Sequence, residues 1–239
     1  MQTGQIIIGN RKDTPSNAIF IPFSGAVALS QAPQTTEQRI TDLVSFVHKQ
    51  TGPNYSAQEI VASLLFQLDF HSTHTGSHSR KVASASYALF SAFENNEFRL
   101  NQLYTAALLH DVGKLAVSTQ ILEKKSKLTS AERKYIQNHP IFTEIILAAF
   151  PIFDPIRKWA AMHHEHLNGT GYPYGRMRNK IPFEARIITV ADIFVALTED
   201  RPYRRGLAAS TAIHKLHTLA NEDILDSKIV KIASETLLS

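Results

Sequence analysis

The residues of this chain best suited to chemistry are histidines and aspartates that occur in adjacent pairs. His110 and Asp111 are adjacent and follow an apolar run. His163 and His164 are adjacent and lead into a glycine-rich loop. The chain has 11 histidines and no cysteine, so a metal site can use only nitrogen and oxygen ligands. Such ligands suit iron, manganese or zinc, and two ions sharing a carboxylate supply what phosphodiester hydrolysis requires.

Three further side chains extend this set of nitrogen and oxygen donors. His78 lies on the apolar stripe of one predicted helix, and Asp192 lies on the apolar face of another. An ionised Asp192 buried there without a partner would be very costly, so it requires a metal ion or a firm set of hydrogen bonds. His139 comes directly before Pro140, where a rigid helix junction can aim its side chain.

Each of these histidines also has a simpler interpretation when it is taken alone. His78 could be a hydrogen-bonded core histidine, and His139 could cap the end of a helix. His163 and His164 could be a solvated pair, and His110 could be a helix-terminal residue favoured by the helix dipole. Their joint occurrence in a chain without cysteine favours a metal centre. We therefore expect phosphodiester hydrolysis at a pair of divalent metal ions.

Helices must position these side chains, because helical periodicity fills most of the chain after residue 35. Apolar spacing and capping signals predict helices over residues 37–50, 57–69, 75–94, 100–111, 130–138, 140–149, 153–165, 183–199, 208–220 and 227–237. The main domain, residues 36–239, is therefore predicted to be all-α. Residues 1–35 contain short β-leaning runs between turn signals and are predicted to form a small segment of their own. The irregular loop 168–180 is the kind of segment that often binds ligands.

Composition narrows the class of protein. The chain of 239 residues is 44% hydrophobic, which is enough for a sizeable core. Its formal charge of +4 is too small and too dispersed to predict DNA binding. The longest apolar runs are too short to cross a bilayer, and the first residues lack the features of a secretory signal. The expected location is therefore the cytoplasm, without attachment to a membrane.

The order of these residues resembles the HD-GYP family of bacterial cyclic-di-GMP phosphodiesterases, which are HD-type metal-dependent phosphohydrolases. The matching strings are HTGSHSRKVA (74–83), LLHDVGKL (108–115), NHP (138–140), HHEHLNGTGYP (163–173), IPFEARIITVADIFVAL (181–197), DRPYRR (200–205) and, in a looser form, ILDSKIV (224–230). The resemblance extends over most of the main domain and implies an HD-type helical bundle for it.

The resemblance implies a ligand set for two divalent ions, either iron or manganese. One ion would be held by His78, His110, Asp111 and Asp192, and the other by Asp111, His139, His163 and His164. Some family members hold a third ion through a glutamate four residues before the first histidine. His74 stands at that position here, so two ions are the favoured number.

The resemblance also implies how the substrate would be bound and cleaved. A hydroxide between the metals would attack phosphorus, with Asp111 bridging the ions and Lys114 contacting a phosphate oxygen. The substrate would be cyclic-di-GMP, and the products pGpG, GMP or both. The residues implied in substrate binding are Lys114, Arg201, Arg204, Gly171, Tyr172 and Pro173.

Departures from the family pattern spare the ligands and lie mostly in and near the loop. The family usually has an arginine near His166 and, outside the loop, an aspartate where Val195 stands. Asn168 stands where the family usually has aspartate, and Arg176 and Arg178 stand where it usually has leucine and glycine. These two arginines could contact phosphate or could simply solvate the rim of the loop. The changes bear on which substrate is bound more than on metal binding.

Two other functions remain open at the level of sequence. The altered loop suits an HD phosphohydrolase for a mononucleotide or for another cyclic dinucleotide, such as 3′,3′-cyclic GMP-AMP. A non-catalytic receptor for a cyclic dinucleotide is the second alternative. An adaptor that docks a GGDEF-type diguanylate cyclase through the GYP loop belongs to the same class. The sequence leaves the oligomeric state open.

Overall fold

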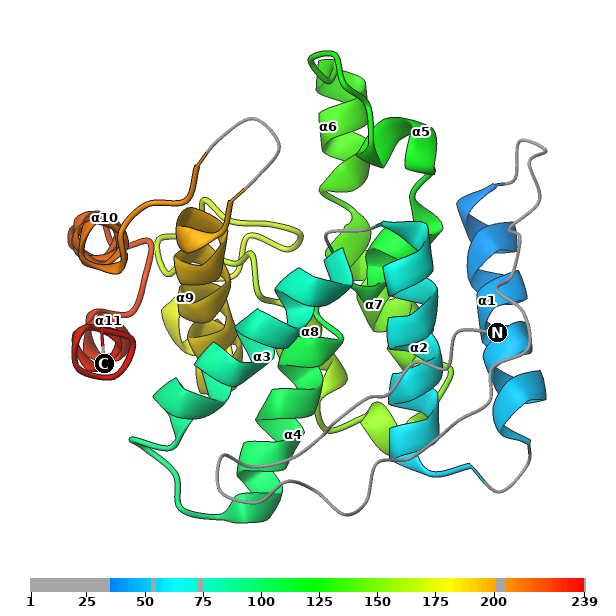
Figure 1. Cartoon of the computed structure of the whole chain (residues 1–239), viewed down its shortest axis with the longest axis horizontal. Helices are drawn as coiled ribbons and strands as arrows, with labels where there is room; N and C mark the ends of the chain where they lie inside the picture. Colours follow the sequence, from blue (N-terminus) through cyan, green and yellow to red (C-terminus); the bar gives the residue numbers. More distant parts are fainter. Residues whose placement is uncertain (1–34, 53–54, 73–74, 201–204, 239) are drawn as a thin grey trace.

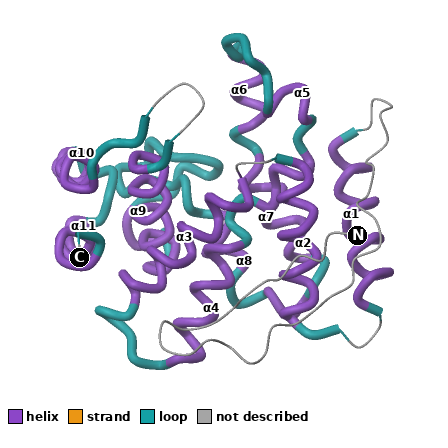
Figure 2. Tube along the Cα trace, viewed as in Figure 1, coloured by secondary structure: helices purple, strands orange, loops and turns teal. Residues whose placement is uncertain are grey.

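The computed structural model describes residues 35–52, 55–72, 75–200 and 205–238. Among them there is no β-strand (Figure 2). The only ladder contact among these residues is an isolated antiparallel bridge between Asn168 and Met177. The all-α prediction for the main domain is therefore confirmed. The β-leaning segment predicted for residues 1–35 lies outside the described residues, except for Thr35.

Eleven α-helices and three short 3₁₀ helices are present in the described part of the chain. The α-helices are α1 (Thr36–Thr51), α2 (Ala57–His71), α3 (Thr75–Phe90), α4 (Glu97–Leu108), α5 (Thr119–Leu122), α6 (Ser130–Ile136), α7 (His139–Ala148), α8 (Arg157–Ala161), α9 (Phe183–Thr198), α10 (Ala209–Asn221) and α11 (Ser227–Thr236). The 3₁₀ helices are η1 (Val112–Ala116), η2 (Pro151–Phe153) and η3 (Arg178–Lys180).

Local side-chain caps explain where several helices begin. Ser56 and Glu59 form a reciprocal capping box at the start of α2, and Thr129 and Glu132 form another at the start of α6. The side chain of Asn96 accepts a hydrogen bond from a backbone amide in the first turn of α4. These caps satisfy backbone N–H groups that have no partner inside the helix.

Two predicted helices were wrong at the ends that carry site residues. The helix predicted over 100–111 ends at Leu108, and the chain tightens into a turn and then η1, so that His110 and Asp111 lie outside the helix. The helix predicted over 153–165 is reduced to α8, which ends at Ala161, and His163 and His164 lie in the turn after it. In each turn, the histidine ring hydrogen-bonds to a backbone carbonyl of the preceding helix's last turn. The ring takes the place of the backbone amide that would bond this carbonyl if the helix continued.

Most buried apolar side chains of the described helices form one large core, and Leu167, Ile181 and Ala185 form a small second cluster. Helix α3 packs against both α4 and α9, and α7 packs against η1 and α8. In Figure 1, α1 lies at one end of the molecule, α10 and α11 lie at the other, and α5 and α6 project from one side. The predicted ligands come from α3, α7, α9 and the turns after α4 and α8, which meet near the middle. Among the described residues, none of the helices combines the length and apolar character that crossing a membrane requires.

Candidate metal centre

The predicted metal ligands gather into three overlapping groups. In each group, one ligand atom from every member lies within 4.8 Å of the others. The groups are His78–His110–Asp192, His110–Asp111–His163 and His139–His163–His164. Because His110 and His163 each belong to two groups, the structure brings all of the predicted ligands into one continuous cluster.

Asp111 lies at the centre of this cluster. Its Oδ1 is 3.2 Å from Nε2 of His139, and its Oδ2 is 3.3 Å from Nε2 of His110. The same Oδ2 accepts a hydrogen bond of 2.6 Å from Nζ of Lys114. Asp111 is only 2% exposed, whereas the side chain of Lys114 is 26% exposed. One carboxylate thus faces histidines from two groups, which is the arrangement that a bridging ligand requires.

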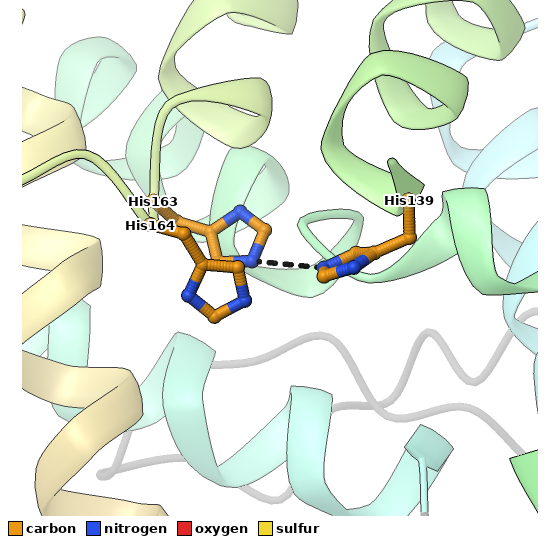
Figure 3. A group of neighbouring side chains, drawn as sticks. All are labelled: His139, His163 and His164. Atoms are coloured by element: carbon orange, nitrogen blue, oxygen red, sulfur yellow. Dashed lines mark hydrogen bonds between the residues drawn. The ribbon is translucent and has the colours of Figure 1, made fainter. Parts of the chain in front are cut away.

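The group of His110, Asp111 and His163 shares one histidine with each of the other two groups, which are the outer groups of the cluster. In one outer group, Nε2 of His78 from α3 is 2.8 Å from Oδ1 of Asp192 on α9. In the other outer group, Nε2 of His139 is 3.3 Å from Nε2 of His163, and the ring of His164 lies 4.0 Å from that of His163, centroid to centroid (Figure 3). The rings of this second group therefore turn their nitrogens toward a common point.

Backbone carbonyls fix three of the rings. His110, His139 and His163 each place Nδ1 at 2.6–2.8 Å from a carbonyl oxygen three residues earlier in the chain. A carbonyl oxygen only accepts hydrogen bonds, so in each ring Nδ1 carries the proton. Nε2 then presents its lone pair to the cluster, as a metal ligand must.

The residues present fit divalent metal ions. Nε2 of His110 and Oδ1 of Asp111 are buried and make no hydrogen bond. Buried polar atoms without a partner are costly and rare in native proteins, and a bound cation would satisfy both. The donors are imidazole nitrogens and carboxylate oxygens only, a set that suits iron, manganese or zinc.

Electrostatics place the acidic ligands in the state that binds metal. Burial opposes ionisation of Asp111, but Lys114 and His110 hold the pKa of its carboxyl well below the ordinary value. Burial likewise opposes ionisation of Asp192, but the hydrogen bond with His78 and the neighbouring histidines His110 and His164 together lower its pKa. Both carboxylates are therefore charged at neutral pH.

Two histidines of the second group, His163 and His164, are neutral at neutral pH. Burial lowers the pKa of His163 well below its ordinary value, and the neighbouring His164 adds to the effect. Burial and His139 lower the pKa of His164 to about 3. His110 differs: burial lowers its pKa, but the charge and hydrogen bond of Asp111, together with the charge of Asp192 and the carbonyl of Ala107, raise it overall. Only neutral imidazoles bind metal, so His163 and His164 need lose no proton to do so.

Comparison with known proteins shows the family. A model described as the HD domain matches residues 59–229, which include every residue of the cluster. The chain belongs to the HD domain family. This result confirms the resemblance that the motifs indicated.

Curated relatives of this HD domain are phosphodiesterases by name. The chain is 41% identical over 155 residues to 3′3′-cGAMP-specific phosphodiesterase 3 of Vibrio cholerae, and the match covers 63% of this chain and 34% of the relative. It is 34% identical over 153 residues to a cyclic di-GMP phosphodiesterase of Pseudomonas aeruginosa, covering 64% of this chain and 37% of the relative. The chain thus spans about a third of the length of the curated relatives it matches.

Solved structures of low sequence identity share the fold of this HD domain. Bd1817, an HDG"Y"P protein from Bdellovibrio bacteriovorus, has a TM-score of 0.57 at 18% identity, covering 87% of this chain and 66% of that one. The HD domain of the L. monocytogenes phosphodiesterase PgpH, in complex with cyclic-di-AMP, has a TM-score of 0.54 at 19% identity, covering 73% and 93% of the two chains. These likenesses confirm the HD-type helical fold.

Close packing between η1 and α7 positions Asp111 in the HD domain. The amide of Gly113 donates to the hydroxyl of Thr143 on α7, which in turn donates to the carbonyl of His110, both at 2.9 Å. A Cβ atom at Gly113 would lie only 1.9 Å from the carbonyl oxygen of His139. This role of Thr143 was not predicted from the sequence, because a buried threonine in an apolar helix carries no signal of it.

The predicted substrate-binding loop lies directly over the second histidine group. The amide of Tyr172 donates to the carbonyl of His164 at 3.0 Å, and the two rings lie 4.6 Å apart at 33°. A Cβ atom at Gly171 would lie 2.4 Å from the carbonyl oxygen of His164, so only glycine fits there. Pro173 follows Tyr172 through a cis peptide bond. Burial, Asp111 and Asp192 all raise the pKa of the Tyr172 hydroxyl.

Glu165 anchors this loop, a role that the sequence analysis missed. Its carboxylate is 3% exposed and accepts hydrogen bonds from the amides of Tyr174 and Arg176, both at 2.7 Å. The available signal was an acidic residue between the histidine pair and the glycine-rich loop. The placement of Glu165 shows why an acidic residue is useful there: one carboxylate satisfies two loop amides.

The two loop arginines occupy structural positions. Arg178 pairs with Asp223 near the start of the segment that leads to α11, and the guanidinium of Arg176 lies 5.8 Å from the ring of Tyr174. For Arg178 this contact favours the rim interpretation over a phosphate contact. Arg201, Arg204 and His74, which the sequence analysis also singled out, lie outside the described residues.

Proposed function

We propose that this chain is a metal-dependent phosphodiesterase that hydrolyses a cyclic dinucleotide. The observation that carries the proposal is the position of the Asp111 carboxylate, buried between His110 and His139 and hydrogen-bonded to Lys114. A carboxylate that faces two groups of imidazole nitrogen donors is suited to hold two cations at once. The relatives named as cyclic-dinucleotide phosphodiesterases support the same class of substrate.

Each ion has its own set of residues in this proposal. The first ion would be held by His78, His110, Asp111 and Asp192, and the second by Asp111, His139, His163 and His164. When bound, iron or manganese ions supply the Lewis acidity that activates water and neutralises phosphate charge. The buried position of the ligands keeps competing water away from the cluster and strengthens every electrostatic contact in it.

Lys114 acts at the edge of the cluster. Its Nζ is fixed by Asp111 while its side chain remains partly exposed, so its remaining protons can reach a phosphate oxygen of a bound substrate. A hydrogen bond from an ammonium group to a phosphate oxygen stabilises the charge that develops as the ester bond is cleaved.

The glycine-rich loop forms the other wall of the substrate site in this proposal. Gly171 allows the loop to approach the histidine turn, Tyr172 covers the ring of His164, and Pro173 continues the wall. Arg201 and Arg204 would bind phosphates, since guanidinium groups match the geometry of phosphate oxygens. Docking of a GGDEF-type diguanylate cyclase on the loop stays a prediction.

Two substrates are to be compared, cyclic-di-GMP and 3′,3′-cyclic GMP-AMP. The motifs favour the first, and the relative that is 41% identical is named for the second. The test is anaerobic purification with iron or manganese, measurement of bound metal, and product analysis on each substrate separately. We expect linear dinucleotides or mononucleotides from at least one of them.

Two results would contradict the proposal. Tight binding of either dinucleotide without cleavage by the metal-loaded protein would favour a receptor. Cleavage of mononucleotides alone would favour the other phosphohydrolase class.

A further inference from the structure

His78 differs from the other fixed histidines in the partner of its Nδ1. His110, His139 and His163 use carbonyls of Ala107, Ile136 and Ala160, respectively. Nδ1 of His78 instead lies 3.2 Å from Oε2 of Glu199, a residue 121 positions away. Of these four rings, only His78 has a carboxylate as the partner of its Nδ1.

Helix position explains the difference. The three carbonyl partners belong to the last turns of α4, α6 and α8, where carbonyls have no helical N–H partner and are free to accept. His78 lies in the first turn of α3, and the carbonyl three residues earlier, that of Thr75, is followed by more helix. Carbonyls inside a helix are engaged in its hydrogen-bond ladder. His78 therefore requires an acceptor from another element.

Helix α9 supplies partners to both nitrogens of this ring. Asp192 contacts Nε2 at 2.8 Å, and Glu199, the residue that follows the last residue of α9, contacts Nδ1. The two residues are two turns apart, which places them on one face of the helix. The other oxygen of Glu199 accepts from Nζ of Lys81 on α3, and the side chain of Glu199 is only 17% exposed. Its carboxylate is therefore fixed from two directions.

We propose that Glu199 is a positioning residue that accepts the Nδ1 proton of His78 and so directs Nε2 of that ring to the metal centre. The inference rests on the metal centre of the proposed function and adds a residue outside its ligand set. Carboxylate partners of metal-bound histidines fix the ring and increase its basicity, and their loss costs about 10–100-fold in metal affinity.

The test is titration of the metal-free full chain with Mn²⁺, with free Mn²⁺ followed by electron paramagnetic resonance. The variants are Glu199→Ala, which removes the acceptor, and Glu199→Gln, which keeps an acceptor oxygen but loses the charge. Glu235→Gln, on an exposed carboxylate of α11, is the control for loss of charge. Thermal unfolding of the metal-free variants reports whether the fold is retained.

We expect the wild type and Glu235→Gln to bind two Mn²⁺ ions alike. In Glu199→Ala, one of the two affinities should fall about 10–100-fold while the other is unchanged, because the group His139–His163–His164 does not touch Glu199. The Mn²⁺ affinity of this site in Glu199→Gln should lie between its values in the wild type and in Glu199→Ala. A purely structural role for Glu199 would not produce this separation between sites or this partial rescue.

Three results would overturn the inference. Wild-type affinity at both sites in Glu199→Ala would show that His78 needs no such partner. Equal weakening of both sites, with a lower unfolding temperature, would assign Glu199 to stability instead. Failure of the wild type to bind Mn²⁺ would overturn the metal centre of the proposed function, and this inference with it.

Discussion

The amide of Gly113 donates a hydrogen bond of 2.9 Å to the hydroxyl of Thr143 and thereby joins the turn that carries Asp111 to helix α7. The same helix begins with His139, so this contact sets the distance between the central carboxylate and one of its histidine neighbours. Replacing Gly113 with alanine tests how closely the two elements must approach.

In Gly113→Ala, the new Cβ would lie 1.9 Å from the carbonyl oxygen of His139 and 2.5 Å from the amide nitrogen of Thr143. Both atoms are backbone, so α7 must shift. We expect a loss of about 1–3 kcal/mol in the free energy of unfolding, as for other overpacked cores. Urea unfolding measures the loss, and metal analysis should show reduced binding. Unchanged stability and metal content would show that η1 and α7 can separate without consequence.

Replacing Asp111 with asparagine or alanine should abolish turnover and lower the metal content. Either variant removes the one carboxylate that faces both outer groups, so two cations would be poorly neutralised. Metal analysis and product assays on the same preparation check both parts. Near-normal rates in Asp111→Ala would refute the bridging role.

Lys114→Ala should give the opposite pattern of effects. Lys114 is not placed among the ligands, so both ions should remain bound, while kcat should fall about 100–1,000-fold as for loss of a charge-stabilising donor. Lys158→Ala, on α8, is a control for loss of a positive charge. A large loss of metal in Lys114→Ala would contradict the assigned role.

Glu165→Gln should loosen the glycine-rich loop without removing metal. The glutamine side chain has one acceptor oxygen, so one of the amides of Tyr174 and Arg176 loses its partner. Leaving such a group unsatisfied costs about 1–3 kcal/mol locally. We expect faster hydrogen exchange in the loop and a higher KM. Glu144→Gln is the matched control, because Glu144 contacts only the side-chain hydroxyl of Tyr174 in this loop. Equal effects in the two variants would refute the anchoring role.

The metal-free protein should lose stability as the pH falls below 6.5. The pKa of His164 is lowered from its ordinary value of 6.5 to about 3 in the folded protein, and that of His163 is also lowered. Between pH 6.5 and pH 3 the unfolded chain therefore binds more protons than the folded protein. Stability is then present above the unfolded pKa and is lost on acidification, by about 2 kcal/mol at pH 5 for His164 alone. The pKa of His110 is raised, so this residue contributes stability at low pH and offsets part of the loss. Urea midpoints at pH 7.5, 6.5 and 5 test the slope; midpoints independent of pH would contradict it.

Local signals in the sequence were enough to determine the helices and the family. Apolar spacing and caps such as Ser56 with Glu59 act over a few residues, and the helix bounds agree with the prediction to within about a turn in most of the domain. The order of the histidines and aspartates identified the type of metal ligand and the HD resemblance, because ligand chemistry follows from residue type.

Only the tertiary structure determined how these residues meet. Asp111 between two histidine groups, Glu165 under the loop amides and Glu199 behind His78 are contacts between segments far apart in the chain. The turns that carry His110 and His163 were predicted as helix, because local spacing continues through them. Their rings leave the helical path where carbonyls of the last turns become available, and the packing of α3, α7 and α9 decides which nitrogen each ring presents to the centre.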